Sequence, residues 1–129
     1  MKESRSRKSM TRALVYYARL KGTCENKKSL DMCLCIKGAC GKNASLARDI
    51  WAAHECLILL DVLGKHEILN MLQSIYVEPF MKKPARKPLK NEISMGILRF
   101  AHQNHLDERT VYRYLRYARI LWHGIREKA

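Results

Sequence analysis

The chain has 129 residues, close to the size of one domain, and its 47% apolar content is enough for one core but not for two large ones. A net charge of +13 and a pI of about 9.8 favour a polynucleotide partner, the alternatives being charge for solubility or an acidic protein partner. No secretory apolar stretch follows the basic N-terminus, and the longest uncharged apolar run, 56–60, is too short to span a bilayer. We therefore expect a cytoplasmic protein with no membrane contact and reduced cysteines.

Apolar residues over 10–20 recur at nearly helical spacing, which predicts a first helix that ends at Gly22. The next apolar stretch, 30–36, is mixed in period and is followed by Gly38 and Gly41. It is predicted to be either a short helix or an irregular clip. Residues 1–42 are thus expected to form a basic N-terminal helix and a cysteine-bearing segment.

A second region, 43–129, is expected to be helical. Asn43 or Ser45 can cap a helix that runs to residue 63, where Gly64 ends it. The same apolar spacing recurs over 65–77 and predicts a further helix nearly in series with the previous one.

Prolines at positions 79, 84 and 88 rule out a continuous helix beyond residue 78. We therefore expect a loop over 79–91, of which 80–91 forms an extended basic segment. Its basic residues are Lys82, Lys83, Arg86, Lys87 and Lys90. No stretch alternates as a strand does, so the predicted fold class is all-α, a single compact helical domain.

Two amphipathic stretches, 93–102 and 107–122, are joined by a short turn at 103–106, which predicts a helix-turn-helix. Asp107 is expected to cap the second helix, because its carboxylate can accept from the first free backbone amides. The predicted core stripe of this helix is Val111, Leu115, Ala118, Leu121, Trp122 and Ile125.

The remaining side chains at the start of this helix are the predicted DNA-binding residues. They are Arg109, Thr110, Tyr112, Arg113 and Arg116, joined by Arg99 and His105 nearby and by Lys82, Lys83, Arg86 and Lys87 of the loop. One arginine can donate two hydrogen bonds to guanine, one to O6 and one to N7, and arginine also binds phosphate. The alternative is that these arginines are solvated or paired with Glu108 and Glu127.

The four cysteines Cys24, Cys33, Cys35 and Cys40 lie within seventeen residues and offer a possible zinc site. Their spacing lacks the paired C-x2-C of zinc ribbons, and cysteine is also a common small core residue. We therefore expect no metal and no other cofactor, with zinc as the less favoured alternative. Cys56, inside an apolar helix, is expected to serve packing.

Catalysis finds little support in the sequence, and we expect no enzyme. His54 and Glu55 lack the second histidine that a zinc protease helix would carry four residues later. Asp61 and His66 are separated by Gly64 and are expected to be exposed, and no phosphate-binding or nucleophile motif occurs in the sequence.

Residues 60–77 (LDVLGKHEILNMLQSIYV) resemble the opening of region 4 of bacterial sigma factors, and 106–118 (LDERTVYRYLRYA) resemble its recognition helix. The loop over 80–91 is longer than the short turn of that family. Together with the basic, cysteine-bearing N-terminal half, the pattern over 46–125 is similar to late antitermination proteins of the Q type from lambdoid phages and prophages.

This resemblance implies a transcription regulator in a bacterial host cell that binds double-stranded DNA at a late promoter. It also implies engagement of RNA polymerase, with a sigma factor as a candidate further partner, so that the polymerase transcribes through terminators. The alternatives are a conventional helix-turn-helix repressor or activator and a basic adaptor that binds an acidic protein.

Overall fold

The computed structural model describes residues 2–23, 29–81 and 91–128, and the side chains of 9–22, 35–81 and 91–128. Within these residues the chain is all-α, with six α-helices and no strand. The helices are α1 (Lys2–Thr23), α2 (Ser29–Cys40), α3 (Ala44–Val62), α4 (His66–Leu72), α5 (Glu92–Gln103) and α6 (Glu108–Lys128). A π-helical turn, η1 (Gln73–Val77), and a 3-10 turn, η2 (Glu78–Phe80), follow α4.

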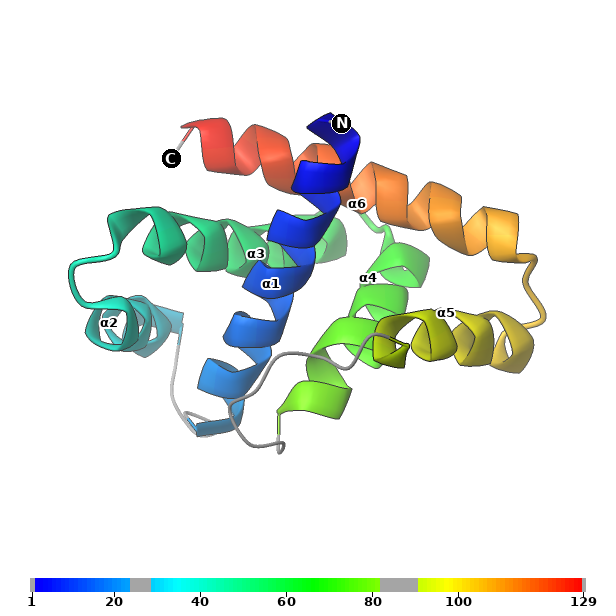
Figure 1. The fold of residues 1–129 in the computed structure, drawn as a ribbon, viewed down its shortest axis with the longest axis horizontal. Coiled ribbons are helices and arrows are strands. Elements are labelled where there is room, and N and C mark those ends of the chain that lie inside the picture. Colours follow the sequence, from blue (N-terminus) through cyan, green and yellow to red (C-terminus); the bar gives the residue numbers. More distant parts are fainter. Residues whose placement is uncertain (1, 24–28, 82–90, 129) are drawn as a thin grey trace.

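One core joins the N-terminal helix to the rest of the molecule. Figure 1 shows α1 crossing α3, while α6 runs along α3 and α5 lies below the first half of α6. The largest fully buried side chains come from α1, α3, α4, the turns after it and α6; they include Met10, Leu14, Ile50, Leu60, Met71, Tyr76, Phe80, Val111 and Trp122. Burial of these apolar side chains is the main force that holds the helices together.

The ends of α3 follow the sequence prediction. The side-chain oxygen of Asn43 accepts a hydrogen bond of 3.1 Å from the amide of Leu46, which confirms the N-cap. At the other end Gly64 has a φ of +74°, and the amide of Lys65 donates to the carbonyl of Leu60 at 2.9 Å. This left-handed glycine ends the helix. Figure 1 shows α4 leaving at a steep angle to α3, so the prediction of two helices nearly in series is wrong.

Gly22 does not end the first helix, because α1 continues through it to Thr23. The glycine is needed for packing instead, since a Cβ at this position would overlap with the backbone carbonyl of Met81. The stretch over 30–36 belongs to a helix, α2, which passes through Gly38 and ends before Gly41, where φ is +56°.

The predicted start of the basic loop is wrong, because Phe80 belongs to the turn η2 and is buried. Its side chain is only 2% exposed and packs in the core, and Pro79 occupies the first turn of η2, where proline fits. Apolar burial therefore keeps 79–81 with the helical body, and the rest of the predicted loop, 82–90, lies outside the described residues. No helix in the described part of the chain is both long and apolar enough to cross a membrane.

Candidate nucleic-acid interface

The turn between α5 and α6 is fixed by backbone hydrogen bonds. The amide of Leu106 donates to the carbonyl of Ala101 at 2.8 Å, and the amide of His105 donates to the carbonyl of His102 at 3.3 Å. This pair of bonds is the Schellman arrangement, which requires a left-handed residue, and His105 has a φ of +54°. Leu106 is half-buried against the core, so the direction in which α6 leaves the turn is defined.

The first turn of α6 begins at Asp107. The carbonyl of Asp107 accepts from the amides of Thr110, at 3.0 Å, and Val111, at 3.3 Å. Asp107 thus occupies the N-cap position that the sequence predicts. The additional bond expected from its carboxylate stays a prediction.

The two faces of α6 separate as its periodicity predicts. Val111, Leu115, Ala118 and Trp122 are buried, and Leu121 and Ile125 are partly buried against the core. On the other face Arg109, Arg113 and Arg116 are exposed, Tyr112 is 43% exposed, and Thr110 is half-buried. The guanidinium of Arg113 donates to the hydroxyl of Thr110 at 3.5 Å, a long contact that leaves both groups close to the surface. The first half of α6 therefore presents a cationic outer face.

The structure describes only some of the other predicted DNA-binding residues. Arg99 of α5 and His105 of the turn are both exposed. The loop residues Lys82, Lys83, Arg86 and Lys87 lie outside the described residues, so their position relative to α6 stays a prediction.

Two contacts near the surface link the start of α4 with α6, and no sequence pattern indicates them. The hydroxyl of Tyr114 donates to the carboxylate of Glu67 at 2.9 Å, and this bond is the main reason why the pKa of Tyr114 is raised. The ammonium of Lys65 lies 5.8 Å from the ring centre of Tyr117. These pairs are far apart along the chain, so only the tertiary fold brings them together.

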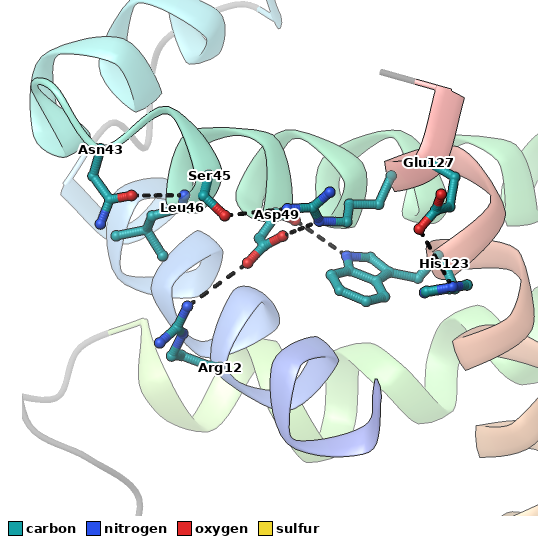
Figure 2. Close-up of polar contacts among 9 residues, drawn as sticks. Arg12, Asn43, Ser45, Leu46, Asp49, His123 and Glu127 are labelled. Carbon is teal, nitrogen blue, oxygen red and sulfur yellow. Dashed lines mark hydrogen bonds and ion pairs between the residues drawn. The ribbon is translucent and has the colours of Figure 1, made fainter. Parts of the chain in front are cut away.

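The second half of α6 is tied to α3 and α1 through a buried carboxylate (Figure 2). Asp49 is only 5% exposed; its carboxylate accepts from the Nε of Arg126 at 2.6 Å and lies 3.7 Å from the guanidinium of Arg12. The indole of Trp122 donates to the backbone carbonyl of Asp49 at 3.1 Å, and Arg126 also donates to the hydroxyl of Ser45. These five residues are called the Asp49 cluster.

The Asp49 cluster lines a polar cavity of about 360 Å³. Its arginines are already matched by Asp49, and Glu127 lies 3.6 Å from His123 at its edge (Figure 2). Because Asp49 already pairs with both arginines, this cavity is a weak candidate for binding the phosphates of a nucleic acid.

The cysteines divide into two groups. Cys56 is buried, its thiol points to the carbonyl of Ala118 at 3.8 Å, and burial raises its pKa to about 12, as expected of a packing residue. Cys35 and Cys40 lie half-buried on α2, and burial raises the pKa of the Cys40 thiol. Cys24 and the side chain of Cys33 lie outside the described residues, so zinc binding by these four cysteines stays untested. The described part of the chain holds no group of three or more potential metal ligands.

Comparisons of the chain with protein-family models, curated proteins and solved structures found no match. The function is therefore inferred from the exposure, charge and placement of the side chains on α5 and α6.

Proposed function

We propose that this chain is a sequence-specific DNA-binding transcription regulator, in which α5, the turn at 104–107 and α6 act as a helix-turn-helix. The observation that carries the proposal is the division of α6 into a buried stripe and an outer face with three exposed arginines in its first half. A recognition helix contacts base edges with its N-terminal residues while its other face packs on the protein core.

The chemistry of this face fits double-stranded DNA. Arg109 and Arg113 can each donate two hydrogen bonds to guanine in the major groove, and Arg116 can bind a phosphate. The net charge of +13 adds sequence-independent attraction through the release of counterions from DNA. Thr110 and Tyr112 would add polar contacts beside the arginines.

The resemblance to late antitermination proteins supports a more specific role, in which the chain engages RNA polymerase at a late promoter and lets it transcribe through terminators. A conventional repressor or activator would use the same DNA-binding face but would not travel with the polymerase. Retention on elongating polymerase, together with transcription past a terminator, separates these two roles. In both roles the chain is a binding protein and not an enzyme.

The proposal is tested by selecting bound fragments from bacterial and phage genomic DNA, and then measuring affinity for the selected site and for random DNA. Replacing Arg109 or Arg113 with Ala should cost about 1–3 kcal/mol on the selected site and less on random DNA, because contacts to bases carry sequence information. Arg48→Ala is the matched control, since Arg48 is an exposed arginine on α3. It should lose no more affinity for the selected site than for random DNA.

Equal losses on both kinds of DNA would make Arg109 and Arg113 phosphate contacts. No loss on either would contradict the assignment of α6 as a recognition helix. Absence of any selected sequence would contradict sequence-specific binding altogether.

A further inference from the structure

A second surface lies far from the proposed DNA-binding face. Figure 1 shows α2 and the start of α3 at one end of the long axis of the molecule, and the turn between α5 and α6 at the other. Where α2 packs against α3, a cavity of about 210 Å³ opens to the surface. It is lined by Ile36 and Lys37 of α2 and by Ala47, Arg48 and Trp51 of α3, and we call it the α2–α3 cavity.

The interior of the α2–α3 cavity is apolar. Among its lining residues Ile36 of α2 is buried, and Ala47 and Trp51 of α3 are half-buried. The volume is below the roughly 300–1,000 Å³ of sites for small organic ligands. It suits one apolar side chain of a larger partner, and the removal of that side chain from water would favour the complex.

Trp51 is held in place from its inner side. Its ring centre lies 5.2 Å from that of His54, and His54 shares a hydrogen bond of 3.1 Å with the hydroxyl of Tyr17 in α1. A large aromatic side chain that is already ordered loses little freedom when a partner binds. Tryptophan is also among the residues that most often dominate the binding energy of protein interfaces.

Two cations flank this apolar interior. Lys37 and Arg48 are both exposed, and no acidic side chain is among the lining residues that the structure describes. The cavity of the Asp49 cluster differs in this respect, because its arginines already face carboxylates. An apolar side chain with carboxylates on its flanks would match the α2–α3 cavity in both shape and charge.

We propose that the α2–α3 cavity is a docking site for an acidic protein segment that inserts one apolar side chain between Lys37 and Arg48 and packs it against Trp51. The proposal goes beyond DNA binding and does not depend on it, because the two surfaces lie at opposite ends of the molecule. The apolar interior favours a peptide over a nucleic acid, whose phosphates would meet only two cations, Lys37 and Arg48, among the lining residues that the structure describes.

The test uses the full chain and a blocked nine-residue peptide with a central leucine between glutamates. Nuclear magnetic resonance of the labelled protein follows the indole N–H of Trp51 and the backbone amides of Ala47 and Arg48 during titration. We expect saturable shifts at these groups. Replacing the central leucine with alanine removes three carbons from the buried side chain and should weaken binding at least tenfold, a loss of at least about 1.4 kcal/mol.

Protein variants separate the contributions of charge and shape. Joint Lys37→Glu and Arg48→Glu substitutions should weaken binding at least tenfold, and Ala47→Leu should do the same by filling the cavity without changing its charge. Joint Lys65→Glu and Lys128→Glu substitutions form the matched control, because they make the same change in net charge at two exposed positions outside the cavity. This control should keep at least half of the affinity.

Three results would overturn the proposal. The first is absence of saturable shifts at Trp51 with the unmodified protein, which needs no variant to fold. The second is equal affinity for a peptide with lysines in place of the glutamates. The third is displacement of the peptide from Trp51 by a single-stranded oligothymidylate that binds more tightly, because bases stack on aromatic rings and the surface would then be a nucleic-acid site.

Discussion

At Gly22, α1 approaches the backbone of Met81, just after η2, closely. A Cβ on Gly22 would lie 2.9 Å from the carbonyl carbon of Met81 and would overlap with its oxygen. Backbone atoms cannot move aside as a flexible side chain can. The contact therefore depends on the absence of a side chain at this position.

We predict that Gly22→Ala destabilises the protein by about 1–3 kcal/mol, the usual cost of overpacking, even though alanine favours a helix more than glycine does. Gly124→Ala is the matched control, because Gly124 is an exposed helical glycine and a Cβ there would meet no described atom within 4 Å. It should stabilise the protein by about 0.5–1 kcal/mol. Urea unfolding measures both changes, and a stabilising Gly22→Ala would contradict the close contact.

His54 is a buried titratable residue outside both proposed binding surfaces. Its Nδ1 shares a hydrogen bond with the hydroxyl of Tyr17, while its Nε2 is buried without a hydrogen-bond partner in the described part of the chain. Burial, and then the positive charge of Lys21, lower the pKa of His54, and Glu55 opposes this shift only in part. The folded protein therefore favours the neutral imidazole.

We predict that this histidine makes the folded state less stable in weak acid. Its pKa is about 6.5 in the unfolded chain and lower in the folded one, so the unfolded state binds more protons as the pH falls below about 6.5. The stability contributed by neutral His54 is fully present above about pH 6.5. It is lost as the pH falls from about 6.5 to the lower pKa of the folded state. His54→Phe should reduce the difference in unfolding free energy between pH 7.5 and pH 5.5, whereas Tyr17→Phe, which keeps the imidazole, should retain it. An unchanged difference in His54→Phe would assign the acid sensitivity to other groups.

Among individual residues, the sequence predicts those whose role is local. Asn43 and Gly64 act on the helix beside them, and their residue types carry the signal. His105 could not be predicted in a left-handed conformation, because glycine or asparagine usually occupies that position. The role of Gly22 also escaped prediction, since its partner is distant in sequence.

At the scale of helices, periodicity predicts α6 well and the segment after α4 poorly. The buried stripe of α6 was predictable because its two faces differ in polarity along the whole helix. Over 73–80 the chain instead passes through a π-helical and a 3-10 turn that bring Tyr76 and Phe80 into the core. When the spacing of the backbone hydrogen bonds changes by one residue, as in π-helical and 3-10 turns, a short apolar sequence shows no clear periodicity.

The Tyr114–Glu67 hydrogen bond joins α6 to α4, and we predict that it stabilises the protein by about 0.5–1 kcal/mol, since it lies near the surface. Tyr114→Phe should remove this contribution. Glu67→Gln should lower the cost of Tyr114→Phe, and a double-mutant cycle measures the coupling. Tyr117→Phe, in the same helix, is the control, because Tyr117 contacts Lys65 through its ring. A coupling of zero would mean that the bond contributes nothing to stability in solution.

For the whole molecule, the sequence predicts the fold class and the outer face of α6, but not what holds the helices together. The fold class follows from apolar spacing, and the exposed arginines follow from the same periodicity. The Asp49 cluster draws on α1, α3 and α6, and nothing in the local sequence indicates that these charges meet. The α2–α3 cavity likewise requires two helices whose packing the sequence left open.

The Asp49 cluster leads to a prediction for the molecule as a whole, because it links the two regions expected from the sequence, 1–42 and 43–129. Arg12 belongs to the first region, and Asp49 and Arg126 belong to the second. Asp49→Asn should cost about 2–3 kcal/mol, since breaking a buried ion pair typically costs about 3–5 kcal/mol and the side chain of Arg126 is still 25% exposed. Arg12→Gln should cost less than about 1 kcal/mol, because Arg12 is 59% exposed and lies 3.7 Å from the carboxylate.

Urea unfolding followed by helical circular dichroism and by tryptophan fluorescence measures both variants. The two signals should change together in each, because Trp122 and the helices that it contacts share one core. A loss below about 0.5 kcal/mol in Asp49→Asn would show that the ion pair is compensated by hydration. Separate transitions for the two signals would show that 1–42 and 43–129 unfold as independent units, in spite of the core that they share.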